Sequence, residues 1–424
     1  MQDIINDEQK RKKLVIYINP PYAEATASDT ISGNKRHKAG LSINRTYEKY
    51  FALLGRGVNE LFIQFLIRIY KEIPGCTLAE FSTLKLLQGQ NLSKFRDSFL
   101  AKLEKIFLVQ GDSFDNVKGK FPIGFFIWNT QINQKFKEIK ADVYIEKNKS
   151  VDFLGNKMIR VVEDKKVILN WMQLFYEKTN DRIAYMVRGA SDFQNNQIVF
   201  ITQTPSIAVV SHSQTHDITK NNLIENCIYF AVRKSVEANW LNNQDQFLFP
   251  NDEWINDVSF HHDCLAYTLF HSKNHVSATN AQNHWIPFTE QEVNAKEKFA
   301  SNFMTDFING KLKLAQAAQN TLFANDTVSG IYDNQPRQFS AEANAVFDAG
   351  RALWQYYHAQ ANVNVNASLY DIREYFQGRN AQGRMNARSD DAEYSALIAE
   401  LRSKLNALAD KIKPKIYEYG FLKE

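Results

Sequence analysis

The chain has 424 residues, of which 44% are hydrophobic and 13% are aromatic. This composition excludes a disordered protein, and the length is enough for two or three domains with cores of their own. The 51 basic and 47 acidic residues leave a net charge of only +4, so the overall charge gives no reason to expect nucleic acid as a partner. Any DNA contact would have to come from local clusters of basic residues.

The cysteines and the N-terminus indicate where the protein resides. Cys76, Cys227 and Cys264 are too few for a disulfide framework and too far apart for a Cys-x-x-Cys metal site, which fits a reducing compartment. Residues 1–13 are charged and lack the apolar core of a secretory signal, and no run approaches the roughly 18 apolar residues of a membrane span. We therefore expect a soluble, cytoplasmic protein that does not enter the membrane.

The first predicted strand is the apolar run 14–18, which is apolar on both faces and therefore indicates a buried strand of a parallel sheet. It ends in Asn19-Pro20-Pro21-Tyr22. An adenine N6 is a poor nucleophile because its lone pair is delocalised into the ring. The side-chain oxygen of Asn19 and the backbone carbonyl of Pro20 would accept its two hydrogens and direct the lone pair toward a sulfonium methyl group.

The remaining residues of the tetrapeptide fit the same chemistry. Pro20 and Pro21 restrict φ and remove N–H donors, which holds the two acceptors rigid. Tyr22 would stack on a base that has been flipped out of the duplex. The structural alternative is that the two prolines only end the strand.

The segment 31–46 follows, and it is polar and basic. Its cations are Lys35, Arg36, Lys38 and Arg45. A basic loop directly after the tetrapeptide would contact the phosphates that flank a flipped base. A solvated loop explains the same composition equally well.

The elements up to residue 130 are predicted from apolar periodicity. They are a helix from Tyr47 to Ile73 stopped by Pro74-Gly75, a strand at 77–87, a helix capped by Asn91 that carries Phe95, Phe99 and Leu103, and strands at 106–110 and 121–128. This order predicts an α/β fold, namely one half of a doubly wound sheet finished by a hairpin.

Two stretches carry a resemblance to a known family. Residues 16–22 and 119–128 make the chain similar to the gamma-class adenine-N6 DNA methyltransferases of type II restriction-modification systems. The resemblance implies the C-terminal half of a Rossmann-like methyltransferase sheet, followed by an α+β target-recognition region and a mainly helical C-terminal region. It implies catalytic roles for Asn19, Pro20, Pro21 and Tyr22. It also implies that Phe121, an aromatic residue before a strand, packs against the flipped adenine together with Tyr22; a core phenylalanine is the alternative.

The S-adenosylmethionine motif of this family is missing from its usual place. The family has a glycine-rich motif upstream of the tetrapeptide, but only eighteen residues precede Asn19 here. No stretch downstream has the glycine spacing and the preceding strand that the motif requires. We therefore expect S-adenosylmethionine as the cofactor, an incomplete site for it in this chain with unknown binding residues, and a second polypeptide that carries the missing motif.

Beyond residue 130 the sequence predicts two further regions. Strand-like runs at 141–145, 198–202, 208–211 and 227–232 suit an α+β target-recognition domain, and helices at 290–308, 341–360 and 391–413, the last stopped by Pro414, suit a helical region. The expected domains are therefore a partial catalytic domain at 1–130, a recognition domain at 131–280 and a helical region at 281–424. The run 261–264, His-His-Asp-Cys, is not expected to bind metal, because adjacent ring nitrogens cannot easily face one ion.

Three functions follow from these observations. The first is a site-specific DNA adenine-N6 methyltransferase, or its acceptor and recognition subunit, with double-stranded DNA and a second polypeptide as partners. The second is a non-catalytic DNA-binding or interaction module left by a truncated methyltransferase gene. The third is another amine substrate, since Asn-Pro-Pro-Tyr also serves the methylation of glutamine side chains and of ribosomal RNA.

Overall fold

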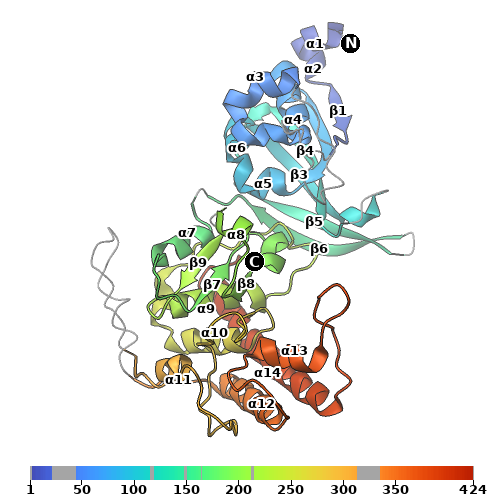
Figure 1. The fold of residues 1–424 in the computed structure, drawn as a ribbon. Coiled ribbons are helices and arrows are strands. Elements are labelled where there is room, and N and C mark those ends of the chain that lie inside the picture. Colours follow the sequence, from blue (N-terminus) through green and yellow to red (C-terminus); the bar gives the residue numbers. More distant parts are fainter. Residues whose placement is uncertain are drawn as a thin grey trace. The chain divides into compact units, whose positions relative to one another are not determined.

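A computed structural model of the chain describes residues 2–21, 44–114, 119–147, 150–163, 165–211, 214–312 and 335–423. The contacts within the chain group it into unit 1, mainly residues 1–165 with 238–246, and unit 2, residues 166–237 with 247–423. Unit 1 contains a six-stranded mixed sheet, and unit 2 contains a small sheet and a helical C-terminal region (Figure 1). The protein is therefore mixed α/β. These two units are defined by contacts within the chain and differ from the three regions predicted from the sequence. The division into three domains stays a prediction.

Unit 1 begins with two short helices and then alternates strands and helices. Its elements are α1 (Gln2–Asn6), α2 (Glu8–Arg11), β1 (Val15–Ile18), α3 (Arg45–Leu54), α4 (Leu61–Glu72), β2 (Thr77–Thr83), α5 (Lys85–Gln88), α6 (Ser93–Ser98), β3 (Ala101–Gln110), β4 (Pro122–Asn133), β5 (Glu138–Lys147) and β6 (Ser150–Arg160). The strand order is β1-β2-β4-β3-β5-β6.

The pairing directions show how the sheet is built. β1 runs parallel to β2, and β3 runs parallel to β5, whereas β4 is antiparallel to both of its neighbours and β6 is antiparallel to β5. The strands predicted at 14–18, 106–110, 121–128 and 141–145 are all present, and the predicted hairpin is the pair β3–β4. The carboxyl ends of β1, β2, β3 and β5 therefore lie at one end of the sheet.

The prediction that β1 is a buried strand is wrong. β1 is an edge strand, and its residues Val15 and Tyr17 are 63% and 64% exposed. An apolar run indicates that a strand has two apolar faces, but it cannot show whether a neighbouring strand or helix covers them.

Two helix predictions in unit 1 also need correction. The helix predicted from Tyr47 to Ile73 is broken at Gly55, which ends α3 with a φ of 54° and is followed by a 3-10 turn, Gly55–Asn59, before α4. Glycine adopts this left-handed conformation without a steric cost. Asn91 does not cap a helix, because it lies in the 3-10 turn Gln90–Leu92, and α6 ends at Ser98.

These local changes move residues between elements. The strand predicted at 77–87 ends at Thr83, and the residues after Leu84 form α5. Leu103, which was expected on a helix, belongs to β3. Phe95 and Phe99 are buried as expected, with their rings stacked 4.9 Å apart.

The core of unit 1 lies between one face of the sheet and the helices α3, α4 and α6 (Figure 1). The sheet contributes Leu78, Leu108 and Phe126, and the helices contribute Phe62 and Phe95, all of them at most 1% exposed. The alternation of side chains along each strand leaves the other face for the odd-numbered positions of β1 and β2.

Unit 2 is dominated by helices packed around a large apolar core. Its elements are α7 (Ile168–Met172), β7 (Ala184–Val187), β8 (Phe200–Thr202), α8 (Ile207–Ser211), β9 (Thr215–Ile218), α9 (Leu223–Ser235), α10 (Val258–Phe270), α11 (Phe303–Ile308), α12 (Ala341–His358), α13 (Leu369–Gln377) and α14 (Ala392–Glu418). The strands form an antiparallel sheet of order β8-β7-β9.

Several predictions in unit 2 are wrong, and each failure has a physical cause. The runs 208–211 and 227–232 are helical. The second of them is fully buried in α9, and a helix that is buried on all sides has no polar stripe to distinguish it from a buried strand. α14 continues through Pro414, because the buried residues Ile412 and Ile416 hold the flanking turns in the core. Of the helix predicted at 290–308, only α11 forms.

The predicted helix at 341–360 is present as α12, and the apolar side of the final helix packs within its own unit. Among the helices within the described ranges, none is both long and apolar enough to cross a membrane.

Candidate functional site

The Asn-Pro-Pro segment directly follows β1. Asn19 and Pro21 are exposed, and Pro20 between them is buried. The segment lies beyond the carboxyl end of a parallel strand, which is the place where open α/β sheets bind their ligands. Tyr22 lies outside the described residues, so its stacking role stays a prediction.

Of the four predicted DNA-contacting cations, Arg45 alone lies within the described ranges; Lys35, Arg36 and Lys38 lie outside them. Arg45 is the first residue of α3 and is exposed. Asn44 caps this helix, since its side-chain oxygen accepts a hydrogen bond from the Tyr47 N–H at 2.9 Å. The position of Arg45 is therefore fixed by its helix, and its contact with phosphate stays a prediction.

Phe121, the second predicted stacking residue, immediately precedes β4 and is half-buried. Two glycines make room for its ring: a Cβ on Gly119 would lie 2.6 Å from Phe121 Cε1, and a Cβ on Gly111 would lie 3.3 Å from Cζ. The Gly111 N–H also donates to the Phe121 carbonyl at 2.8 Å. The ring therefore has a defined place that both glycines are needed to preserve.

The structure brings Asn19 and Phe121 to the same end of the sheet. β4 begins where β2 ends, with Ile123 opposite Thr83, and β1 ends on the other side of β2. Because neighbouring strands lie roughly 5 Å apart, β1 and β4 are separated by about 10 Å across the sheet. The predicted stacking role of Phe121 is compatible with this placement and stays a prediction.

One buried polar residue beside this segment was not anticipated from the sequence. Glu80 of β2 is opposite Ile18 in the register with β1, and its side chain is fully buried on the helix-covered face. Its Oε1 accepts hydrogen bonds from Trp128 Nε1 and Ser82 Oγ, both at 3.3 Å. Burial raises the pKa of Glu80 to about 8, and these two hydrogen bonds oppose that rise only in part. The carboxyl is therefore neutral at pH 7.

The face of the sheet away from the helices carries a row of aromatic rings, one from each strand. This aromatic face consists of Tyr17, Phe81, Phe125, Phe107, Tyr144 and Phe153, in the order of the strands across the sheet. Neighbouring ring centroids lie 6.4, 4.8, 5.1, 6.0 and 5.5 Å apart along the row. The two end members, Tyr17 and Phe153, are 64% and 57% exposed. The four rings between them are half-buried. A continuous apolar strip that is partly exposed is typical of an interaction surface.

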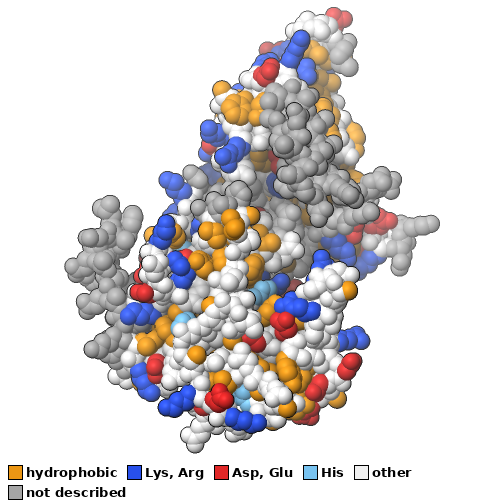
Figure 2. All heavy atoms as spheres, in the orientation of Figure 1, with side chains coloured by type: hydrophobic (Ala, Val, Ile, Leu, Met, Phe, Trp, Pro, Cys, Tyr) orange, Lys and Arg blue, Asp and Glu red, His pale blue; other side chains and the backbone are white. Residues whose placement is uncertain are grey.

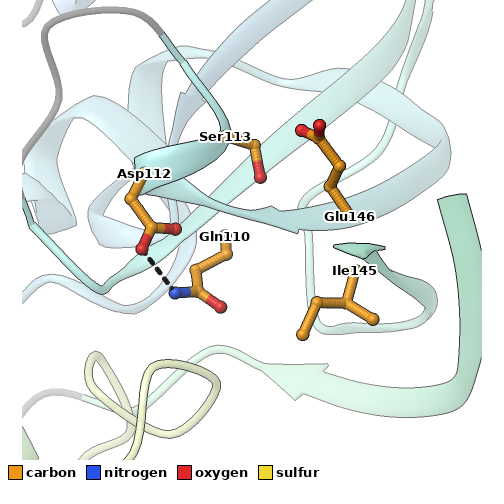
Figure 3. Close-up of a pocket in the computed structure, with 5 residues that line it drawn as sticks. All are labelled: Gln110, Asp112, Ser113, Ile145 and Glu146. Atoms are coloured by element: carbon orange, nitrogen blue, oxygen red, sulfur yellow. Dashed lines mark hydrogen bonds between the residues drawn. The ribbon is translucent and has the colours of Figure 1, made fainter. Parts of the chain in front are cut away.

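A pocket of about 330 Å³ opens at the same end of the sheet as Asn19, between the ends of β3 and β5 (Figure 3). It is lined by Gln110, Asp112, Ser113, Ile145 and Glu146, and Gln110 Nε2 donates to Asp112 Oδ2 at 2.8 Å. β2 and β4 separate it from β1 in the sheet. Its two carboxylates make it unsuitable for a phosphate, and it does not adjoin the Asn-Pro-Pro segment.

Three residues of the run 261–264 in α10 have side-chain partners within the protein. His261 Nε2 contacts the Trp254 carbonyl at 2.7 Å, His262 Nδ1 contacts the Gln338 carbonyl at 2.8 Å, and Asp263 accepts from Ser340 Oγ at 2.6 Å and pairs with Lys411 at 3.0 Å. Within the described parts of the chain, no three His, Cys, Asp or Glu side chains are grouped so as to hold a metal ion.

Charge is mixed over the visible surface. Lys and Arg side chains alternate with Asp and Glu side chains on the face shown in Figure 2, as the net charge of +4 suggests. Any contact with DNA on this face would therefore be made by individual basic side chains and not by a large basic surface.

Comparisons with known proteins show no family model that matches the chain and no match among curated proteins. The solved structures that are similar to it include two restriction-modification enzymes. One is the ATP-dependent type ISP restriction-modification enzyme LlaBIII bound to DNA, with 14% identity and a TM-score of 0.20 over 32% of this chain. The other is the type IIL restriction-modification enzyme MmeI in complex with DNA, with 10% identity and a TM-score of 0.28 over 96% of this chain. The chain spans 10% of the first protein and 57% of the second. Scores this low do not establish a common fold.

Proposed function

We propose that this chain is the acceptor and target-recognition part of an S-adenosylmethionine-dependent DNA methyltransferase that acts on the N6 of a flipped adenine. The observation that carries the proposal is the position of Asn19-Pro20-Pro21 directly beyond the carboxyl end of the parallel strand β1. The strand is followed by helices, a second parallel strand and then a hairpin, which is the order that the resemblance implies for the second half of a Rossmann-like sheet.

The acceptor chemistry belongs to the residues of this segment. Asn19 Oδ1 and the Pro20 carbonyl accept the two N6 hydrogens of adenine, and this draws the nitrogen lone pair out of conjugation with the ring. Pro20 is buried and its φ is restricted, so the backbone that carries this carbonyl has few accessible conformations. These fixed acceptors stabilise the positive charge that develops on N6 as the new bond forms.

A flipped base also needs aromatic side chains that stack on it. Tyr22 follows the segment in sequence, and Phe121 supplies a ring at the same end of the sheet, held over Gly111 and Gly119. Stacking on aromatic side chains compensates for the loss of base stacking in the duplex. Lys35, Arg36, Lys38 and Arg45 then contact the phosphates on either side of the flipped nucleotide.

S-adenosylmethionine supplies the methyl group of this reaction. The described segments after β1, β2 and β3 are Asn-Pro-Pro, Leu84 with α5, and the short turn Gly111–Ser113. None of these is the glycine-rich turn into a long helix that holds such cofactors. We therefore assign cofactor binding to a second polypeptide.

Two features of unit 1 suit that second polypeptide. The outer edge of β1 has no partner strand among the described residues, so its backbone can pair with a strand of another chain. The aromatic face continues from this edge through Tyr17 and suits a covering layer, because sheets with parallel strands are normally covered on both faces. A donor polypeptide that adds a strand beside β1 and helices over the aromatic face would bring the cofactor next to Asn19.

The decisive experiment measures methyl transfer by the chain alone and after mixing with the polypeptide encoded by the neighbouring reading frame. Double-stranded DNA and S-adenosylmethionine are supplied, and N6-methyladenine is measured by mass spectrometry of the digested DNA. We expect N6-methyladenine to form only when the two polypeptides are mixed. It should not form when this chain carries Asn19→Ala.

The other outcomes distinguish the remaining functions. Activity of the chain by itself would contradict the need for a donor polypeptide. DNA binding that survives Asn19→Ala, without methylation in any mixture, would favour a non-catalytic DNA-binding module. Methylation of protein glutamine or of ribosomal RNA in place of DNA would overturn the assignment of the substrate.

A further inference from the structure

Unit 2 contains a group of basic side chains that come from three separate segments. We call Lys234, His271, Lys273, His275 and Arg373 the basic cluster. Lys234 lies at the end of α9, His271 directly follows α10, Lys273 and His275 lie in the segment after it, and Arg373 is in the middle of α13. All five side chains are partly buried.

Backbone contacts hold these segments in place. The Ile201 N–H of β8 donates to the Lys273 carbonyl at 3.0 Å, and the His275 N–H donates to the Ile201 carbonyl at 2.8 Å. Arg373 Nη1 donates to the Ser272 carbonyl at 3.1 Å. The cluster therefore rests on a strand and two helices, and the segment that carries Lys273 and His275 is not a free loop.

No carboxylate within the described residues balances these charges. Glu374 of α13 is paired with Arg379 at 2.6 Å. Asp371, the other acidic residue of α13, accepts from Ser277 Oγ and from the Ala278 N–H and Ser368 N–H. The buried Nε of Arg373 has no hydrogen-bond partner. A partly buried guanidinium without a counter-charge lowers the stability of the fold, because it loses hydration. A bound anion would compensate for this loss.

The electrostatics of the individual groups agree with this picture. Burial, together with the charges of Lys273 and Arg233, lowers the pKa of Lys234 to about 7. Burial lowers the pKa values of His271 and His275 to about 3 and about 4, and Lys234, Lys273 and Arg373 act in the same direction on both. Lys273 and the protonated form of Lys234 therefore repel each other, and a bound anion would relieve that repulsion.

A neutral histidine can still donate a hydrogen bond to an anion. The Lys273 N–H donates to His271 Nδ1 at 3.0 Å, so this nitrogen carries no proton and the proton is on Nε2. A neutral His271 thus presents an N–H donor. His275 lies against the rings of Tyr370 and Phe200, with ring centroids 5.2 Å away in both cases, and these contacts fix its orientation.

Helix ends account for part of the cluster only. Lys234 and His271 lie at the carboxyl ends of α9 and α10, where the helix dipole favours positive charge. Lys273, His275 and Arg373 have no such position. Donors of three kinds from three segments suit a phosphate, which offers more oxygens than a carboxylate and is a usual partner of Arg and Lys.

We propose that the basic cluster is a binding site for a phosphate group. The group comes either from a nucleic acid backbone or from a small free phosphate. The proposal concerns unit 2 and does not depend on the assignment of Asn19, so a chain that fails to methylate DNA can still carry this site.

The test uses the full chain with Lys273→Gln, with Lys273→Glu and with the double variant Lys234→Gln and Lys273→Gln. Lys404→Gln is the matched control, because Lys404 is exposed on α14 and paired with Glu400 at 3.0 Å, and it removes the same charge elsewhere in unit 2. Binding to a DNA duplex is measured by fluorescence anisotropy over a range of salt concentrations. Binding of inorganic phosphate and of pyrophosphate is measured by calorimetry.

If the phosphate belongs to a DNA backbone, the double variant should bind the duplex about tenfold more weakly, and the slope of log K against log salt should fall by about one. Lys273→Glu should weaken binding more than Lys273→Gln, and Lys404→Gln should behave like the wild type. If the phosphate is a small free one, pyrophosphate binding should weaken in the same order while duplex binding stays unchanged.

The proposal is overturned if neither ligand binds the wild type, or if the three cluster variants bind both ligands as tightly as Lys404→Gln does. Lys273→Gln keeps the test valid if the double variant folds poorly, because the Lys273 side chain is partly exposed and its hydrogen bonds to β8 come from its backbone.

Discussion

Glu80 of β2 lies opposite Ile18 of β1, so a fully buried carboxyl sits one strand away from the residue that precedes Asn19. Its pKa is raised by burial from 4.5 to about 8. In this range of pH the folded protein binds a proton that the unfolded chain releases, and the free energy of unfolding therefore falls as pH rises from about 4.5 to about 8. Below 4.5 and above 8 this contribution no longer changes.

Glu80→Gln should remove that pH dependence. The amide is neutral at every pH, so we expect the variant to be about as stable as the wild type near pH 5 and more stable near pH 8, by on the order of a few kcal/mol. Denaturation in guanidinium at both pH values measures the difference. Glu72→Gln is the control, because Lys49 and Arg68 donate to Glu72 and lower its pKa to about 2; the titration of Glu72 therefore lies below pH 5, and its replacement should leave the difference in stability between pH 5 and pH 8 unchanged. Equal pH profiles for Glu80→Gln and the wild type would show that the carboxyl is not neutral when buried.

Val15→Lys and Tyr17→Lys should prevent the donor polypeptide from binding at the edge of β1. Both side chains are more than 60% exposed, so the stability of the isolated chain should change by no more than about 0.5 kcal/mol. Association is measured by size-exclusion chromatography of the mixed polypeptides, and methyl transfer is measured in parallel. Val151→Lys is the control on β6, at the other edge of the sheet, where the side chain is 69% exposed. Persistence of the complex in both β1 variants would place the partner elsewhere.

Phe121→Leu tests whether this ring contacts the flipped base. Loss of one stacking ring should lower kcat/KM for duplex DNA by about tenfold to a hundredfold, since the stacking of a base on an aromatic side chain contributes roughly 1–3 kcal/mol. Phe126→Leu, at a core position of β4, the strand that follows Phe121, should lower the melting temperature instead. If Phe121→Leu lowers only the melting temperature and leaves kcat/KM unchanged, Phe121 is a core residue without a role in the site.

The strands around the site could be predicted because their signals are local. The runs 14–18, 106–110 and 121–128 contain β-branched and aromatic residues in short apolar stretches, and all three are strands. Their neighbours could not be predicted, because pairing depends on residues far away in the chain. The position of β1 at the sheet edge is such a property, and the same holds for the aromatic face, which exists only once six strands have adopted their register.

The functional residues divide in the same way. Asn19 to Tyr22 could be found from a short motif, whereas Glu80 could not, because a carboxylate in a strand is usually exposed and nothing in its sequence neighbourhood indicates burial. The basic cluster joins Lys234, Lys273 and Arg373, which are about 40 and 100 residues apart in the chain. Tertiary packing brings them together, as it also makes the buried run 227–232 a helix against its strand-like composition.

Arg233→Met should destabilise unit 2 by about 3–5 kcal/mol. Arg233 is fully buried in α9 and donates to Asn196 Oδ1 at 2.5 Å, to Tyr229 Oη at 2.9 Å and to the carbonyls of Ala190 and Asp192 at 2.9 and 3.1 Å. Methionine fills much of the same volume but leaves these buried acceptors without donors, and each loss costs about 1–3 kcal/mol before relaxation. Arg233→Lys should recover part of the stability, since a lysine restores the charge but not the planar fork. Hydrogen exchange of α9 measures the change within unit 2.

Arg351→Met is the control, because Arg351 forms surface ion pairs with Asp348 and Glu292 and its loss should cost no more than about 1 kcal/mol. If Arg233→Met lowers the free energy of unfolding by no more than Arg351→Met does, water molecules must donate to the buried acceptors in place of Arg233. Water would then reach the interior of unit 2.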